Sequence, residues 1–277
     1  MFKIGCHLSI SKGLTAMVKD AVSIQANVFQ FFCRNPRGKG ALRFKDQDIE
    51  TFCRLLREQG FGPLLVHSPF IVNPASVEEK VQELTREVLR EDLNFTAKVD
   101  GAMYNFHPGN YLKRTPQEGI IAIADTINNV VPDDFPGFVL LETMAGKGTE
   151  LGRSFEELRQ IIDLTKCPEK LGVCLDTCHI WDGGYDVKFG LEQTLEKFDR
   201  VLGMSRLKAI HLNDSLNERG THKDRHAKIG CGKLGTGTMA KIINHPDLCE
   251  LPFYLETPNE LDGYAEEIKI LRDLYIQ

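Results

Sequence analysis

The 277-residue sequence lacks several features that define common classes of protein. No apolar run reaches the ~18 residues of a membrane span, so a transmembrane protein is not expected. The N-terminal stretch MFKIGCHLS has no basic segment followed by an apolar one, which excludes a typical secretory signal peptide. The eight cysteines include no C-x2-C pair, which disfavours a zinc knuckle or a dithiol redox motif. Without an export signal, we expect reduced thiols in a cytoplasmic protein.

The sequence also has no surplus of basic residues. Its 34 Lys and Arg residues stand against 39 Asp and Glu residues, which gives a formal net charge of −5. Proteins that bind nucleic acids usually carry a basic face, so the overall charge at first argues against such a partner. Hydrophobic residues make up 42% and charged residues 26% of the chain, which excludes a disordered protein and fits a globular one.

Short β-rich runs alternate with amphipathic segments along the whole chain. Their short, apolar character is typical of parallel strands that are buried on both faces. Eight such units over residues 1–277 predict a single-domain α/β protein, a (β/α)8 TIM barrel with its active site at the C-terminal ends of the strands. An open doubly wound sheet is the alternative, but no G-x-G-x-x-G follows the first run. The runs cover residues 2–8, 28–32, 63–67, 101–107, 138–143, 171–177, 207–214 and 253–257.

Three of the intervening segments begin with helix-start signals. Ser76 and Ser154 each precede a Glu by three positions, which is the pattern of a capping box. Thr115 precedes a proline, which is favoured at the first position of a helix. The longest predicted helix covers residues 76–98 and ends before an Asp-Gly pair.

Side chains that can bind metal ions end six of the eight predicted strands. Because a parallel barrel brings these ends to one mouth, the six side chains should surround a single site. Three further candidates follow the sixth and seventh strands closely. Imidazoles and carboxylates suit Zn²⁺, Mn²⁺ or Fe²⁺, and nine of them suit two or three ions with a bridging carboxylate. The six are His67, His107, Glu142, Asp176, His211 and Glu256, and the three are His179, Asp224 and His226.

Two basic segments follow strands on the same face. Residues 33–45 contain five Lys or Arg and no acid, and residues 219–233 contain five with Asp224 as their one acid. Basic segments beside a metal site fit contacts to the phosphates of DNA or RNA. Phe70 and Ile71 are large apolar residues in the loop after His67. They either wedge into a base stack or pack on the rim of the barrel.

The three remaining histidines carry weaker signals. His7 ends the first run, where it is either a neighbour of the ligands or a hydrogen-bonded core residue. His222 and His245 stand in polar, loop-like surroundings, so we expect both to be exposed to solvent.

Seven motifs, in order along nearly the whole chain, resemble the endonuclease IV family of zinc-dependent apurinic/apyrimidinic (AP) endonucleases. Such a set of spaced and unusual motifs is highly specific. The motifs are H-x2-F-x2-N from His67, N-F-H-P-G from Asn105, L-E-T-M-A-G-K-G from Leu141, D-T-C-H from Asp176, H-L-N-D from His211, D-R-H from Asp224 and L-E-T from Leu255.

The resemblance implies a TIM barrel with three Zn²⁺ ions, for which Mn²⁺ or Fe²⁺ could substitute. It also implies how the nine candidates divide among the ions. The implied sets are His67, His107 and Glu142 for the first ion; Glu142, Asp176, His211 and Glu256 for the second; and His179, Asp224 and His226 for the third.

The implied activity is that of a DNA-repair hydrolase, an AP endonuclease that cleaves the phosphodiester bond 5′ to abasic sites in double-stranded DNA. Cleavage would leave a 3′-hydroxyl and a 5′-deoxyribose phosphate, with a metal-bound hydroxide as nucleophile and Glu142 as the catalytic residue. Arg37, Phe70 and Ile71 would contact the DNA, and Phe70 stands where the family often has Tyr. A cytoplasmic monomer is expected, and three divalent cations would more than offset the formal charge of −5.

Two other functions remain as alternatives at this point. A metal-dependent sugar isomerase-like barrel would need only one or two ions, and the basic segments would have no purpose there. A non-catalytic protein that binds damaged DNA would use the same surface, but nine metal-binding side chains would then be unexplained.

Overall fold

The computed structural model describes residues 1–36, 40 and 44–276. Eight parallel strands form one sheet whose neighbours follow chain order, with the last strand beside the first. A parallel bridge between His7 and Gln30, with the Leu8 amide donating to the Gln30 carbonyl at 2.8 Å, joins the two remaining edges. This closure confirms the predicted TIM barrel. The strands are β1 (Ile4–Cys6), β2 (Gln30–Phe32), β3 (Leu65–His67), β4 (Met103–Phe106), β5 (Val139–Glu142), β6 (Leu171–Asp176), β7 (Leu207–His211) and β10 (Phe253–Leu255).

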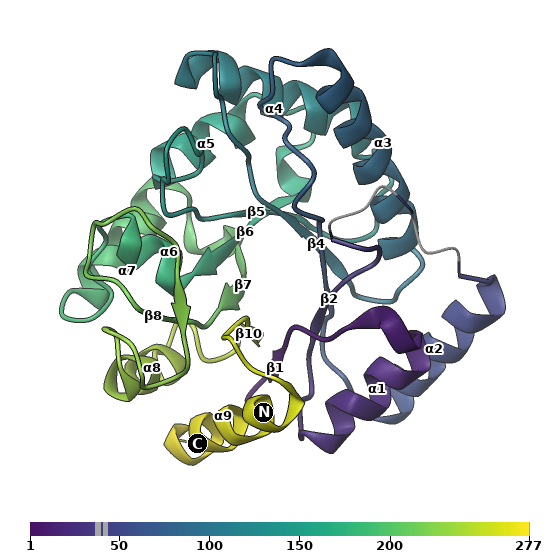
Figure 1. Cartoon of the computed structure of the whole chain (residues 1–277), viewed down its shortest axis with the longest axis vertical. Helices are drawn as coiled ribbons and strands as arrows, with labels where there is room; N and C mark the ends of the chain where they lie inside the picture. The colour runs from purple at the N-terminus through teal and green to yellow at the C-terminus, as the bar shows by residue number, and fades with distance from the viewer. Residues whose placement is uncertain (37–39, 41–43, 277) are drawn as a thin grey trace.

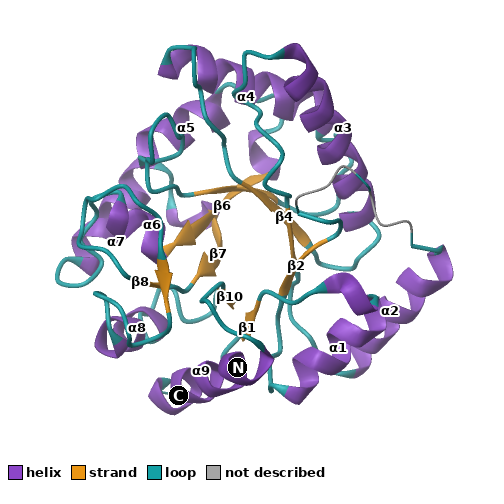
Figure 2. Cartoon of the chain, in the orientation of Figure 1, coloured by secondary structure: helices purple, strands orange, loops and turns teal. Residues whose placement is uncertain are grey.

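Helices surround the barrel as an outer ring (Figure 1; Figure 2). None of those in the described part of the chain is long and apolar enough to cross a membrane. The α-helices are α1 (Leu14–Ser23), α2 (Asp46–Glu58), α3 (Glu79–Thr96), α4 (Pro116–Val130), α5 (Phe155–Asp163), α6 (Thr177–Asp182), α7 (Leu191–Val201), α8 (Thr236–Ile243) and α9 (Leu261–Leu274). Short 3-10 turns precede α1, β6 and β7 at Ile10–Lys12, Pro168–Lys170 and Met204–Arg206.

One of the three predicted helix starts has a complete cap, and a second has half of the predicted capping box, because the Glu157 carboxylate accepts from the Gly152 and Arg153 amides rather than from that of Ser154. Thr115 and Glu118 form a complete capping box at α4, and the Ser154 hydroxyl accepts from the Glu157 amide at 3.2 Å at α5. The prediction for Ser76 is wrong, because α3 begins three residues later, at Glu79. The Ser76 hydroxyl instead accepts from the amide two positions on, at 3.1 Å, which stabilises a turn ahead of the helix.

One apolar layer inside the barrel positions the polar residues above it. Successive side chains of a strand point to opposite faces, so a residue two positions further on returns to the same face. Each residue of the apolar layer is followed, two positions later, by a polar residue at the C-terminal mouth. The layer consists of Val28, Leu65, Met103, Leu140, Cys174, Ala209 and Tyr254. The polar residues above it are Gln30, His67, Asn105, Glu142, Asp176, His211 and Glu256.

The seventh predicted run is divided in the structure. It forms β7 and then a separate strand, β8 (Asp214–Ser215), which pairs antiparallel with β9 (His226–Ala227). The helix α6, which follows β6 directly, is also an addition to the predicted elements. All eight cysteines are free thiols, as expected.

Candidate metal centre

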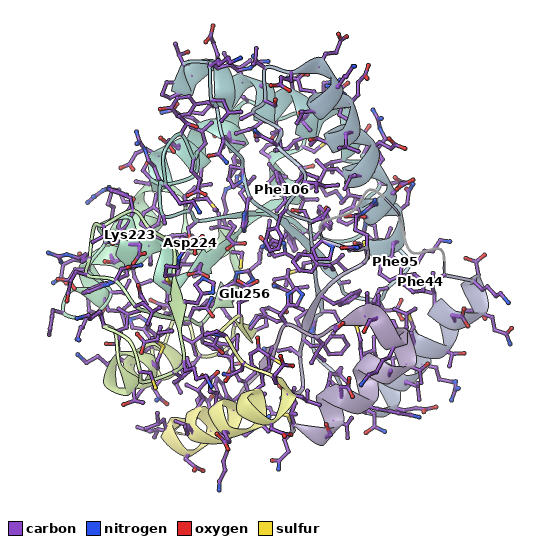
Figure 3. The ribbon with its side chains drawn as sticks, viewed as in Figure 1. Phe44, Phe95, Phe106, Lys223, Asp224 and Glu256 are labelled. Carbon is purple, nitrogen blue, oxygen red and sulfur yellow. The ribbon has the colours of Figure 1, made fainter. Side chains whose placement is uncertain are left out.

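The nine predicted metal-binding side chains converge at the mouth of the barrel. Within each of three groups, the candidate donor atoms lie within 4.8 Å of one another. Asp224 joins the third group at one side, with Oδ1 3.1 Å from His179 Nε2 and 3.6 Å from His226 Nε2. In Figure 3 Glu256 lies near the centre of the barrel, and Asp224 lies to its left. The groups are His67, His107 and Glu142; Glu142, Asp176, His211 and Glu256; and Asp176, His179 and His226.

Glu142 lies at the centre of the site and is fully buried. Its Oε2 atom is 3.1 Å from His67 Nε2 and 3.3 Å from His107 Nε2. Its Oε1 atom is 3.2 Å from His211 Nδ1, on the side of the second group. The two oxygens of one carboxylate therefore face two groups, which is the arrangement of a bridging ligand.

The electrostatics of the site keep the carboxylates of Glu142 and Glu256 ionised. Burial alone would raise the pKa of Glu142, but the charges of His211 and His107 hold that pKa well below its ordinary value. Burial also opposes ionisation of Glu256, yet His211 outweighs it and lowers the pKa of Glu256 to about 2. These buried carboxylates require positive charge close by. A bound divalent cation would supply that charge, so the histidines would not need to be protonated.

Three buried polar atoms in the site have no hydrogen-bond partner among the described residues. They are Glu142 Oε1, His211 Nδ1 and His226 Nε2. A buried polar atom without a partner costs about 1–3 kcal/mol, so such atoms are rare unless something else satisfies them. All three belong to the candidate groups, and their chemistry is that of zinc ligands. The residues present therefore fit bound metal ions.

Four of the five candidate histidines are oriented by a second hydrogen bond. In each, the ring nitrogen that points away from the site donates to an oxygen, which fixes the ring and leaves the other nitrogen free to bind a metal. The bonds are His67 Nδ1 to Ser68 O at 2.8 Å, His179 Nδ1 to Thr143 O at 2.9 Å, His211 Nε2 to Gln30 Oε1 at 2.6 Å, and His226 Nδ1 to Glu256 O at 3.1 Å.

Three amide side chains that the strand-end pattern does not identify support the carboxylates. Each donates a hydrogen bond to one of them from a buried position. Two of these amides, Gln30 and Asn105, occupy the inward positions above the apolar layer, so in-strand alternation is a signal that could have found them. The bonds are Asn105 Nδ2 to Glu142 Oε2 at 2.6 Å, Gln30 Nε2 to Glu256 Oε1 at 2.6 Å and Asn213 Nδ2 to Asp176 Oδ2 at 2.7 Å.

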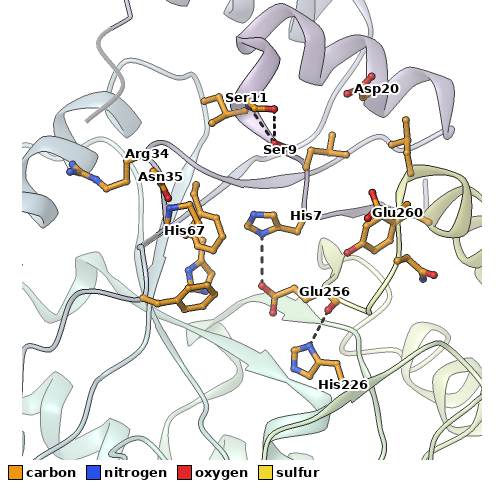
Figure 4. Close-up of a pocket in the computed structure, with 18 of the residues that line it drawn as sticks. His7, Ser9, Ser11, Asp20, Arg34, Asn35, His67, His226, Glu256 and Glu260 are labelled. Carbon is orange, nitrogen blue, oxygen red and sulfur yellow. Dashed lines mark hydrogen bonds and ion pairs between the residues drawn. The ribbon is translucent and has the colours of Figure 1, made fainter. Parts of the chain in front are cut away.

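The weaker histidines fall in three different places. His7 lies beside the ligands, with Nδ1 3.9 Å from Glu256 Oε1 (Figure 4), and burial lowers its pKa to about 4. His222 is exposed, as expected. The prediction for His245 is wrong, because it is only 8% exposed and pairs with Glu192 Oε1 at 3.1 Å. It lies just beyond the end of α8 and contacts α7, so a polar sequence context does not imply exposure.

A cavity of about 970 Å³ opens over the candidate metal groups (Figure 4). Phe70 lies in its wall with 64% of its surface exposed, and its ring centroid is 5.3 Å from that of Phe32. Ile71 is half-buried beside it. An exposed aromatic ring at the mouth of the cavity is available to a ligand.

The structure describes two of the five cations in the predicted basic segment 33–45 and all five in the segment 219–233. In the segment 33–45, Arg37 lies outside the described residues, and Arg34 is 1% exposed, with Nε donating to Asp92 Oδ1 at 2.7 Å. Its expected role as a surface cation is therefore wrong, because a buried carboxylate engages it. In the segment 219–233 all five basic side chains are exposed or partly exposed, although Arg219 and Lys233 each pair with an acid. Figure 3 shows Lys223 beside Asp224 on this segment.

Together, the fold and the site define a TIM barrel that gathers imidazoles and carboxylates at its C-terminal mouth. Residues 18–274 match the family model described as a xylose isomerase-like TIM barrel. A protein of Alkaliphilus oremlandii named "Probable endonuclease 4" is 52% identical over 275 residues, which cover 99% of this chain and 98% of that protein. A protein of Clostridium beijerinckii with the same name is 50% identical over 275 residues, which cover 99% of this chain and 99% of that protein.

A solved structure agrees with these relatives. The crystal structure of endonuclease IV from Thermus thermophilus has a TM-score of 0.88 at 31% identity, with 98% of each chain covered. The chain belongs to the endonuclease IV family, a family of nucleases. The resemblance expected from the sequence motifs is thereby confirmed.

Proposed function

We propose that the protein is an AP endonuclease that hydrolyses the phosphodiester bond 5′ to abasic sites in double-stranded DNA. The products would carry a 3′-hydroxyl and a 5′-deoxyribose phosphate. The observation that carries the proposal is the convergence of nine metal-binding side chains, three with unpaired buried atoms, in a chain 52% identical to a protein named as an endonuclease. A DNA-repair role follows from this substrate.

Three Zn²⁺ ions are part of the proposal, held by the sets that the motifs imply. When bound, such ions lower the pKa of water from 15.7 towards ~7 and stabilise the charge that develops on a phosphoryl group. The buried contact between Asp176 Oδ2 and His226 Nε2, at 3.6 Å, brings the second and third sets close together. A compact site of this kind can address one phosphodiester with all three ions.

The chain's own residues perform the remaining tasks in this proposal. Glu142 Oε1, which has no hydrogen-bond partner among the described residues, is placed to orient the attacking water and accept its proton. Phe70 and Ile71 would fill the gap in the base stack at the abasic site. The exposed cations of residues 219–233, with Arg37, would contact phosphates on either side.

A cleavage assay tests the proposal against both alternatives. The substrate is an end-labelled duplex with one tetrahydrofuran abasic analogue, and the control is the same duplex without it. Nicking on the 5′ side of the analogue is expected. Binding without nicking would instead support a damage-binding protein, and neither binding nor nicking would support a sugar-directed barrel.

Metal content provides the second test. The purified protein should contain three zinc ions per chain, and prolonged incubation with EDTA should remove both the metal and the activity. Activity that persists in protein verified to be metal-free would exclude the metal mechanism. We also propose a cytoplasmic monomer, in keeping with eight free thiols, and size-exclusion chromatography with light scattering should give a mass near 31.2 kDa.

A further inference from the structure

The helix α6 connects two residues of the third candidate group. It carries His179, and Asp176 caps its N-terminus by accepting from the His179 amide at 2.7 Å. At its other end lies Asp182, which is fully buried although no proposed metal set includes it. The helix packs beside β8, at the start of the loop that holds Asp224 (Figure 1).

The C-terminal end of α6 holds this loop at four points. Alternate amides of the loop donate to the end of the helix, and the Trp181 indole donates back to the loop. These bonds satisfy carbonyls that a helix end otherwise leaves unpaired. They are Trp181 Nε1 to Asn217 O at 2.9 Å, the Gly220 amide to Trp181 O at 3.0 Å, the His222 amide to Asp182 O at 3.0 Å, and the Asp224 amide to Asp182 Oδ2 at 2.8 Å.

The loop needs this support because its backbone is strained. Asp224 has φ +57° and His222 has φ +54°, in the left-handed region that non-glycine residues seldom adopt. Such conformations persist only where the surroundings fix them. The Asp182 carboxylate contacts the strained residue directly through the Asp224 amide.

The Asp182 carboxylate is itself fixed in place. Its Oδ1 atom accepts from the Ser215 hydroxyl at 2.7 Å, and Oδ2 accepts from Asn217 Nδ2 at 2.9 Å as well as from the Asp224 amide. A buried carboxylate with one donor on β8 and two on the loop that follows is a rigid anchor for that loop.

We propose that Asp182 is the positioning residue of the third metal site, an inference that rests on the proposed function. It would hold the Asp224 backbone so that Asp224 Oδ1 stays 3.1 Å from His179 Nε2. His179 belongs to α6, the helix that ends at Asp182. Asp224 lies in a loop, outside regular structure, whereas the first two sets stand on barrel strands or beside them. Asp182 would therefore govern the third site and leave the other two intact.

Zinc binding by the purified protein tests this role. Asp182→Ala should lower the affinity of the third site for zinc by roughly 10–100-fold, which is the usual effect of losing a residue that orients a metal ligand. Titration with a competing chelator should then release one ion early, with the other two retained as in the wild type. In the zinc-free variant, hydrogen exchange of the Asp224 amide should be faster than in the zinc-free wild type. In the zinc-loaded variant, kcat for cleavage should fall with little change in KM.

Two further variants separate positioning from general damage. In Asp182→Asn the amide oxygen can still accept from Asp224 and Asn217, while its NH2 group donates to Ser215, so the third ion should be retained. Ser215→Ala removes a donor from the same carboxylate but leaves the bond to Asp224, so it should lower stability and also retain the third ion.

Each outcome decides the question. Wild-type affinity for all three ions in Asp182→Ala, or equal loss of the third ion in Ser215→Ala, would overturn the positioning role alone. Fewer than three ions in the unmutated protein would instead overturn the three-ion form of the proposed function, and the role of Asp182 with it. A folded Asp182→Asn variant without the third ion would also contradict the proposal, because it keeps the hydrogen-bond geometry.

Discussion

At the scale of single residues, the protein assigns different tasks to chemically identical side chains. Glu142 is fully buried and its two oxygens face separate groups, whereas Glu256 contacts His211 on one side of the second group only. Both lie above the apolar layer, two residues beyond Leu140 and Tyr254, but they follow different strands of the barrel. The task of a carboxylate therefore follows from its place around the barrel rather than from its chemistry.

Glu142→Gln should keep the fold and lose most of the cleavage activity. The amide has the same shape, but its NH2 group cannot accept a proton or bind a cation, so kcat should fall by more than ~100-fold. The measurement is nicking of the duplex with the abasic analogue, with circular dichroism to verify the fold. Glu266→Gln, the same change at an exposed position, serves as the control. Near-normal cleavage by Glu142→Gln would remove its catalytic role.

Phe70→Ala should raise the KM for the abasic duplex and leave the stability of the protein almost unchanged. The ring is 64% exposed, so its loss should shift the free energy of unfolding by less than ~0.5 kcal/mol. Stacking on a base is worth about 1–3 kcal/mol, so KM should rise by roughly tenfold. Phe70→Tyr keeps the aromatic face and should behave as the wild type. An unchanged KM in Phe70→Ala would mean that the ring only packs on the rim.

At the scale of elements, alternation along the strands determines how much of the site the sequence predicts. The convergence of all six strand-end candidates is predictable, because the C-terminal ends of barrel strands meet at one mouth. Gln30 and Asn105 obey the same alternation, but an amide is not a typical metal ligand and so gives no chemical signal. Asp182 shows neither the strand alternation nor a position at a strand end. It ends a six-residue helix, and its role depends on a loop that is distant in sequence.

The elements that escape prediction have local causes. The helix α6 follows β6 with no loop between them and has only six residues, which is too short for a helical period to show in the sequence. The hairpin of β8 and β9 has only two residues in each strand, which is too short for any periodicity. In both places tertiary contacts, rather than local preference, set the backbone.

A buried ion pair joins the end of β2 to α3 and provides a test at this scale. Asp92→Asn would leave the buried Arg34 charge without its main partner, so the free energy of unfolding should fall by about 3–5 kcal/mol. Glu91→Gln removes a second acidic partner of Arg34. The Glu91 side chain is 46% exposed, so this change should cost less than ~1 kcal/mol. Urea denaturation measures both. Equal effects would show that the buried pair is not the anchor of this segment.

At the scale of the whole molecule, the closure of the barrel depends on a glycine. A Cβ atom on Gly5 would lie 1.6 Å from the Val28 carbonyl oxygen, so β1 can approach the chain before β2 only without a side chain. The bridge between His7 and Gln30 lies at the same junction. Gly5 therefore permits the contact that turns an open sheet into a barrel.

Gly5→Ala should destabilise the protein strongly, because backbone rather than a flexible side chain would have to move. We expect a loss of about 3 kcal/mol or more, and a fall in Tm of at least roughly 6 °C. Gly237→Ala is the matched control, because nothing lies within 4 Å of its added Cβ in α8, and it should be neutral or slightly stabilising. Differential scanning calorimetry measures both, and similar Tm values would contradict the account of closure.

The distribution of the site around the barrel also determines when a newly made chain can become active. Glu256 follows the last barrel strand, and the Gln30 amide that supports it comes from the second. A ribosome must therefore deliver almost the entire chain before the second group is complete. Partial or prematurely terminated products would carry the first group without the second. The metal centre of such a product would be incomplete, because the second group needs Glu256.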